Sequence, residues 1–264
     1  MGERGLCDAL GVPRLVDGAI TVVLGPGLAP GLAGLGVLAA MQERGLPISQ
    51  VIGVNTGALA AALWAVESDL ALGAKVLGSL PWEHYVVARD LGTADPLLAA
   101  IQLLTRGMDF EKTQRRIAVV AMDAEDGRPV WIEQGSIALA VRGALSLPGL
   151  FHPLAIAGRR LLDGGCVWHR ALPPRASKRL LVCHGVPAGR CEVPSGFSSL
   201  AMDLALFAAW TWSRPQDPGG ATIVCDSIGG LLDFHRAEAW YEAGRRAFGR
   251  WVAGLQGAAA DIEG

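Results

Sequence analysis

Residues 18–41 carry no charged side chain and are long enough to imitate a membrane-spanning helix. The middle of this stretch, however, holds two prolines and several glycines, which would break such a helix. The run AITVVL at residues 19–24 is typical of a buried strand in a parallel sheet, because β-branched residues dominate it and a glycine follows. We therefore predict a strand at residues 19–24, a glycine loop at 25–31 and a helix at 32–44.

The same order of strand, turn and helix follows directly. Residues 50–54 (QVIGV) predict a second buried strand, and residues 56–66 (TGALAAALWAV) predict a helix. Further strands are predicted at residues 116–124, 129–132, 179–184 and 221–225, and further helices at 197–212 and 235–255. Strands that alternate with helices indicate a layered α/β fold with a mostly parallel central sheet. We expect one domain over residues 1–264, with its core at 19–255, because no repeat or long linker divides the chain.

Composition argues against a nucleic-acid partner and against a metal site. The chain has 23 basic and 25 acidic residues, and its arginines are scattered, so we expect no nucleic-acid partner. Five cysteines and a start without a signal peptide favour free thiols in the cytoplasm. Cys166 and His169 stand at a C-x-x-H spacing, and Cys183 and His184 follow, but zinc sites usually pair their ligands more tightly. We predict no metal and no cofactor.

Two turns carry residues suited to catalysis. In parallel sheets, function gathers at the carboxyl ends of the strands. Gly53 and Gly57 stand two residues either side of Asn55, which is the spacing of the G-x-S-x-G nucleophile elbow. Asp163 precedes Gly164-Gly165 after an apolar run, a suitable position for a general base. Taken alone, the first string fits any turn from strand to helix, and the second fits a hairpin turn.

In their order along the chain, these blocks resemble the patatin-like phospholipase family in its compact bacterial form. The matching blocks are Pro26 to Gly31, the elbow, ALSLPGLFHP at residues 144–153, Asp163-Gly164-Gly165 with Pro173 downstream, Asp233-Phe234 and the helix around Gly244. The resemblance implies a three-layer α/β/α fold. It also implies hydrolysis of acyl lipids by a serine–aspartate dyad, with N–H groups of the glycine loop stabilising the oxyanion.

Within this resemblance, Asp163 takes the base position and Asn55 takes the serine position, with Gly53, Thr56 and Gly57 completing the elbow. A carboxamide has no oxygen comparable to a serine alkoxide, so the family's nucleophile is lost. The oxyanion loop also departs from the family's G-G-G-x-R-G. Its residues here are Gly27, Leu28, Ala29, Pro30 and Gly31, preceded by Pro26. Proline at the arginine position removes an N–H, whereas Asn55 still tolerates a positive φ and can donate to Asp163.

These departures favour a catalytically disarmed pseudoenzyme that binds an acyl lipid, a membrane surface, a protein partner or a second copy of itself. The alternative is an active acyl hydrolase that combines Asp163 with Thr56 or with water. Thr56 is better explained as the first residue of its helix. The apolar helix at residues 200–212 is read as buried or, alternatively, as a lipid-facing patch of a peripherally attached protein. An engineered Asn55 is disfavoured, because Leu28 and Pro30 depart from the family pattern as well.

Overall fold

The structure is a computed structural model that describes residues 20–67, 69–82, 85, 95–148, 151–170, 180–188 and 221–263. The helix predicted at residues 197–212 lies outside these ranges, and so does Pro173. All other predicted strands and helices fall within them, apart from a few terminal residues.

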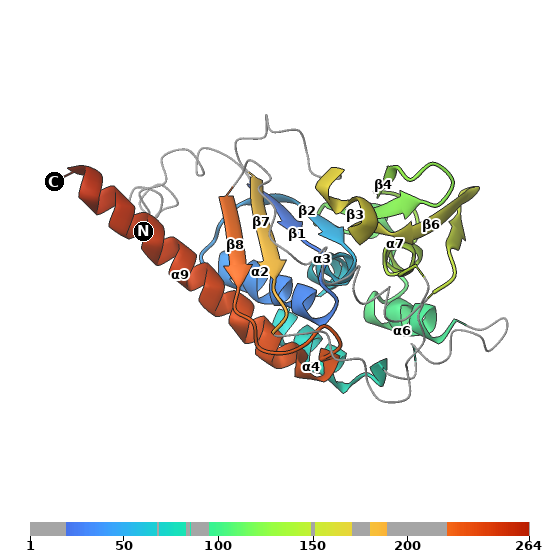
Figure 1. Cartoon of the computed structure of the whole chain (residues 1–264), viewed down its shortest axis with the longest axis horizontal. Helices are drawn as coiled ribbons and strands as arrows, with labels where there is room; N and C mark the ends of the chain where they lie inside the picture. Colours follow the sequence, from blue (N-terminus) through green and yellow to red (C-terminus); the bar gives the residue numbers. More distant parts are fainter. Residues whose placement is uncertain are drawn as a thin grey trace.

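The centre of the described structure is a mixed sheet with the strand order β5-β6-β3-β2-β1-β7-β8, in which β4 also pairs with β3 (Figure 1). The strands are β1 (Ile20–Leu24), β2 (Ile48–Val54), β3 (Ile117–Asp123), β4 (Pro129–Ile132), β5 (Leu154–Ile156), β6 (Arg159–Asp163), β7 (Leu180–Gly185) and β8 (Ala221–Cys225). The strands β3, β2, β1, β7 and β8 run parallel, whereas β4, β5 and β6 pair in antiparallel fashion. The mostly parallel sheet is thus confirmed, and an antiparallel extension adds to it beyond β3.

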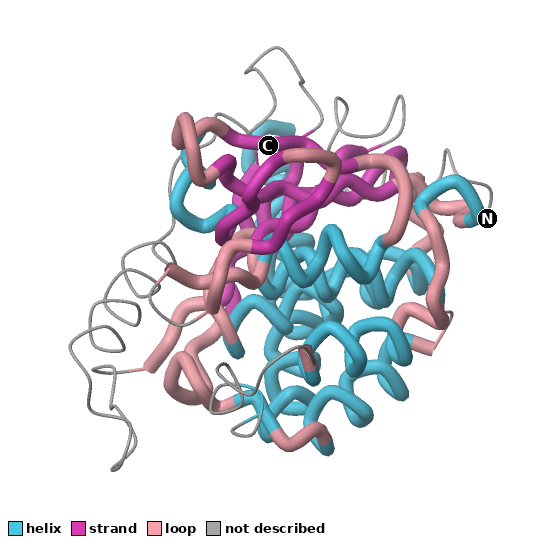
Figure 2. The backbone as a smooth tube through the Cα atoms, turned by 90° about the vertical axis from the view of Figure 1, so that its right-hand side faces the viewer, coloured by secondary structure: helices cyan, strands magenta, loops and turns pink. Residues whose placement is uncertain are grey.

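Helices flank this sheet. They are α2 (Ala33–Glu43), α3 (Thr56–Val66), α4 (Leu70–Ser79), α6 (Pro96–Leu104), α7 (Ile137–Ala144) and α9 (Ala237–Glu263), with short 3-10 helices η1 (Ala29–Leu32), η3 (Phe110–Lys112), η4 (Gly164–Arg170) and η5 (Phe234–Arg236). Helices α2, α3, α4 and α9 lie together on one side of the sheet (Figures 1 and 2). On the other face, Trp168 of η4 packs with Val54 and Val120 in a smaller apolar cluster. The sheet therefore lies between two layers, as the three-layer α/β/α prediction requires.

The packing of α9 on α2 depends on two glycines. A Cβ added at Gly36 of α2 would overlap the carbonyl oxygen of Tyr241, and a Cβ at Gly244 of α9 would overlap that of Ala33. The two backbones therefore touch where the helices cross, which holds α2 firmly behind the glycine loop that precedes it. The predicted helix at residues 235–255 is confirmed, although it begins at Ala237 and runs on to Glu263.

Three helices that the periodicity did not predict are α4, α6 and α7. Each begins after a capping residue whose side chain accepts a backbone N–H of the first turn. These caps are Asp69, Asp95 and Ser136, with donors at Leu72, Leu98 and Leu139. Such caps satisfy donors that a helix start leaves open, so they offered a local signal for these short helices.

Candidate functional site

The carboxyl ends of β2 and β6 meet on strand β3. Val54 at the end of β2 pairs with Val120, and Asp163 at the end of β6 pairs with the next residue, Ala121. Strand β4 pairs with β3 at both of these positions and so occupies one edge of β3. Strands β2 and β6 must therefore lie end to end along the other edge. They approach from opposite directions, since β2 runs parallel to β3 and β6 antiparallel. This register brings Asn55, the residue after Val54, against Asp163.

Asn55 is the strained apex of the turn between β2 and α3, with φ 55° and ψ −127°. Within the described residues its side chain forms no N-cap bond to α3, although asparagine is a preferred capping residue. Instead, Nδ2 donates to Asp163 Oδ2 at 2.5 Å, and Oδ1 accepts the Leu28 N–H at 3.1 Å. The Leu28 N–H can only donate, so it identifies the oxygen end of the amide. Helix capping therefore does not explain Asn55.

The glycines of the predicted elbow are required by close backbone contacts. A Cβ at Gly53 would overlap Cα of Ala58, and a Cβ at Gly57 would overlap the carbonyl oxygen of Leu24. Strand β2, helix α3 and the end of β1 are thus packed backbone against backbone around the turn. This crowding leaves the apex side chain directed out of the turn, toward Asp163 and Leu28.

Asp163 is completely buried and both of its carboxyl oxygens have donors. Oδ1 accepts the N–H of Gly165 at 2.7 Å, while Oδ2 accepts from Asn55. Burial raises the pKa of Asp163 to about 7, and the bonds from Gly165 and Asn55 oppose that rise. The backbone N–H of Asp163 donates to Ser146 O at 3.0 Å, a contact that the sequence did not suggest. The carboxyl group thus changes its protonation near neutral pH while held by fixed donors.

The predicted oxyanion loop is buried, and the N–H groups of Leu28, Ala29 and Gly31 are already engaged. The Leu28 N–H donates to Asn55 Oδ1, the Ala29 N–H to Leu231 O at 2.9 Å, and the Gly31 N–H to Leu28 O at 2.9 Å. Proline at position 30 has no N–H to offer. Leu28 itself has φ 54° and ψ −130°, a left-handed conformation that costs a leucine strain energy. Of these donors, the Leu28 N–H is the one that bonds to the elbow residue.

Thr56 joins the elbow to the same loop. Its Oγ1 donates to Leu28 O at 2.6 Å and lies 3.2 Å from Asn55 Oδ1. Within the described part of the chain, its hydroxyl makes no contact with Asp163. The structure therefore brings together Asn55, Thr56, Asp163 and the loop, and it places the Thr56 hydroxyl on the loop side of this group.

The structure describes three of the cysteines and His184, one of the histidines noted in the sequence. Cys166, Cys183 and Cys225 are free thiols, and burial raises the pKa of Cys166 to about 12. His184 is fully buried beside the Trp168 ring, with ring centroids 4.9 Å apart, and burial lowers its pKa to about 4. Among the residues that the structure describes, no group of three or more His, Cys, Asp or Glu side chains is placed to hold a metal ion.

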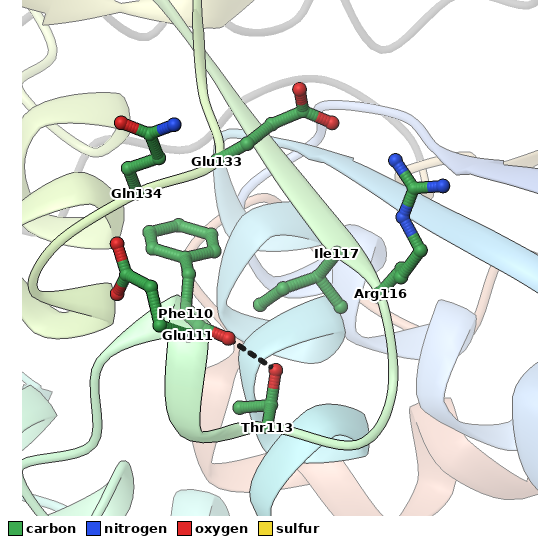
Figure 3. A pocket seen from close by; sticks show the side chains of 7 residues that line it. All are labelled: Phe110, Glu111, Thr113, Arg116, Ile117, Glu133 and Gln134. Atoms are coloured by element: carbon green, nitrogen blue, oxygen red, sulfur yellow. Dashed lines mark hydrogen bonds between the residues drawn. The ribbon is translucent and has the colours of Figure 1, made fainter.

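A hollow of about 370 Å³ lies at the amino end of β3 (Figure 3). It is lined by Phe110, Glu111, Thr113, Arg116, Ile117, Glu133 and Gln134. Two of its carboxylates are already engaged, Glu111 by the Gly135 N–H and Glu133 by Gln50 Nε2 at 2.6 Å. Since Ile117 opens β3 and Ala121 lies beside Asp163, the hollow is at the other end of the strand and shares no residue with the predicted site.

No helix in the described ranges is both long and apolar enough to cross a membrane.

Comparison with known proteins places this sequence in a family. The family model for patatin-like phospholipase matches residues 22–173, which span β1 to η4 and include both Asn55 and Asp163. An uncharacterised NTE family protein of Mycobacterium bovis is 29% identical over 152 residues, which cover 55% of this chain and 42% of that protein. Lysophospholipase nte1 of Neurospora crassa is 29% identical over 226 residues, covering 80% of this chain and 15% of that protein.

The chain therefore spans less than half the length of these curated relatives. Among solved structures, VipD from Legionella pneumophila aligns with 88% of this chain and 67% of its own, at 13% identity and a TM-score of 0.47. The family model covers more than half of the chain, from the first strand of the sheet to the Asp-Gly-Gly turn. This protein belongs to the patatin-like phospholipase family.

Proposed function

We propose that this chain is a disarmed member of the patatin-like lipid hydrolase family, which binds an acyl lipid without hydrolysing it. One observation carries the proposal: the Asn55 carboxamide bridges the Leu28 N–H and the Asp163 carboxyl. In the family's dyad these two groups serve as oxyanion donor and base, and a serine hydroxyl attacks between them. The carboxamide supplies no such hydroxyl, so no acyl-enzyme can form at this position.

The oxyanion loop supports the same conclusion. The Leu28 N–H is occupied by Asn55 Oδ1, position 30 offers no N–H, and the Ala29 and Gly31 N–H groups donate to backbone carbonyls. Loss of one oxyanion donor lowers kcat by roughly 10²–10³ in a well-studied protease, and loss of the nucleophile by roughly 10⁶. Both losses fall on the same step of the reaction, so the family's route to hydrolysis is closed here.

A second candidate, an active hydrolase, draws support from Asp163. A pKa of about 7 suits a general base at neutral pH, which would activate Thr56 or a water molecule. Against it, the Thr56 hydroxyl donates to Leu28 O and lies away from Asp163. In addition, both Asp163 oxygens already accept hydrogen bonds and the residue is completely buried. We therefore favour binding over turnover.

The class of ligand follows from the family. A relative that aligns with 80% of this chain is named as a lysophospholipase. We therefore propose a single-chain acyl lipid such as lysophosphatidylcholine as the ligand. A protein partner or a second copy of the chain remains a separate prediction.

The test compares hydrolysis of p-nitrophenyl butyrate, p-nitrophenyl palmitate and lysophosphatidylcholine by the unchanged chain, Asn55→Ser, Asn55→Ala and Asn55→Ser/Asp163→Ala. We expect activity only in Asn55→Ser, because serine restores the hydroxyl and frees the Leu28 N–H. Asn55→Ala is the matched control, since it frees the same N–H without supplying a nucleophile.

Binding of lysophosphatidylcholine to the unchanged chain, followed by calorimetry, completes the test. A single Asp163→Ala variant tests the alternative: turnover by the unchanged chain that survives Asn55→Ala and disappears in Asp163→Ala would instead establish the active hydrolase. Absence of lipid binding would refute the proposed role of the site.

A further inference from the structure

One contact between the elbow and the glycine loop is not used by the proposed function. We propose that Thr56 is a positioning residue whose hydroxyl holds the Leu28 peptide groups so that the Leu28 N–H points at residue 55. The inference rests on the proposed function only in treating the Leu28 N–H as the family's oxyanion donor. The contact itself is a feature of the fold.

Two consecutive residues of the elbow, Asn55 and Thr56, form hydrogen bonds through their side chains to the same loop residue, Leu28. The Leu28 N–H donates to Asn55 Oδ1 at 3.1 Å, and the Leu28 carbonyl accepts from Thr56 Oγ1 at 2.6 Å. These bonds lie on either side of the Leu28 Cα, so together they restrain both its φ and its ψ. Both are buried, which strengthens them relative to bonds exposed to water.

Leu28 needs such a restraint. Its φ of 54° and ψ of −130° almost equal those of Asn55, yet leucine tolerates a positive φ much less well than asparagine does. A free leucine would relax to a negative φ and turn its N–H away from the elbow. The hydroxyl that holds its carbonyl therefore opposes the conformational preference of the side chain.

The loop is also shaped to admit the hydroxyl. A Cβ at Gly31 would overlap Thr56 Oγ1, so the glycine leaves the space that this oxygen fills. The first residue of a helix commonly bonds within its own turn, but the Thr56 acceptor lies 28 residues away in the chain. Thr56 thus acts on the loop rather than on its own helix.

The test is amide hydrogen exchange measured by NMR in Thr56→Val, which keeps the shape of the side chain, and Thr56→Ser, which keeps the hydroxyl. Reference amides in the same loop are those of Gly25, bonded to Cys183 O, and Ala29, bonded to Leu231 O. We expect Thr56→Val to speed Leu28 exchange roughly fivefold relative to both references, as the loss of one net hydrogen bond implies. In Thr56→Ser, which keeps the hydroxyl, the Leu28 amide is expected to exchange as slowly as in the unchanged chain. Thr56→Ala is a second variant without the hydroxyl, for use if valine prevents folding.

Equal acceleration of all three amides would overturn the proposal, because it would mean that Thr56 supports only the stability of the fold. Unchanged Leu28 exchange, or a Thr56→Ser chain that behaves like Thr56→Val, would overturn it as well.

A second arm separates this inference from the proposed function. In the Asn55→Ser chain, labelling by a fluorophosphonate is expected to slow with Thr56→Val and to recover with Thr56→Ser. An Asn55→Ser chain that takes no label contradicts the assigned nucleophile position, while the exchange of Leu28 still decides the role of Thr56.

Discussion

Replacing Asp163 by asparagine is predicted to change how stability depends on pH. The carboxyl group is fully buried, and burial raises its pKa from 3.8 to about 7. The folded state therefore holds this proton more tightly than the unfolded state. The stabilisation is fully present below about pH 4 and is lost as the pH rises to about 7. At about 1.4 kcal/mol per pH unit, the whole change amounts to about 4 kcal/mol.

His184 opposes this trend in the unchanged protein. Burial lowers its pKa from 6.5 to about 4, so its contribution is present above pH 6.5 and is lost as the pH falls toward 4. Between about pH 4 and 6.5 the two slopes have opposite signs and similar size. The stability of the unchanged chain is thus expected to be nearly flat in this range, and only a difference between variants isolates Asp163.

The assay is urea unfolding of the unchanged chain and Asp163→Asn at about pH 4.5, 5.5, 6.5 and 7.5. Asparagine does not titrate, and it keeps one acceptor oxygen where Asp163 uses one for Gly165 and another for Asn55. One of these two donors therefore loses its acceptor, which lowers stability by an amount that does not vary with pH. The stability of Asp163→Asn relative to the unchanged chain should rise by about 1.4 kcal/mol per pH unit and level off near pH 7. Asp126→Asn, in an exposed turn, serves as the matched control. Parallel curves for Asp163→Asn and the unchanged chain would refute the reasoning.

Two further substitutions test the packing. Gly244→Ala should destabilise the fold by about 1–3 kcal/mol or more in urea unfolding, because its Cβ would overlap a backbone carbonyl of α2. Gly249→Ala, in the same helix but facing open space, should gain up to about 1 kcal/mol, and equal effects would contradict the close contact. Arg142→Met removes the buried partner of Asp95, at 2.7 Å, and should cost about 3 kcal/mol. Adding Asp95→Asn should recover part of this loss, and an additive double variant would count against the ion pair.

The elbow was predictable because its constraint is local. Gly53 and Gly57 stand where a strand must turn sharply into a helix, and the backbone contacts at both positions require glycine. The strand before them and the helix after them follow from apolar runs of suitable length. For the same reason, the sequence suggested that Asn55 occupies a position with positive φ, and its φ is 55°.

The approach of Asp163 to Asn55 was predictable only through the family resemblance. It depends on the register of β2 and β6 on β3, which no short pattern around Asp163 encodes. The direction of the Asn55 amide is set by the Leu28 N–H, a backbone group whose orientation follows from an unusual φ. Thr56 was expected to serve its own helix, because the loop that accepts its hydroxyl is distant in sequence.

The end-to-end meeting of β2 and β6 also has a consequence for folding. The bond from Asn55 to Asp163 joins residues 108 positions apart, so a long stretch of chain must be closed before the bond contributes anything. The elbow, by contrast, is built from β1, β2 and α3, which lie close together in the chain. The burial that raises the pKa of Asp163 likewise requires β6 to be in place beside β3, so an intermediate made only of the first strands and helices would not show the raised pKa.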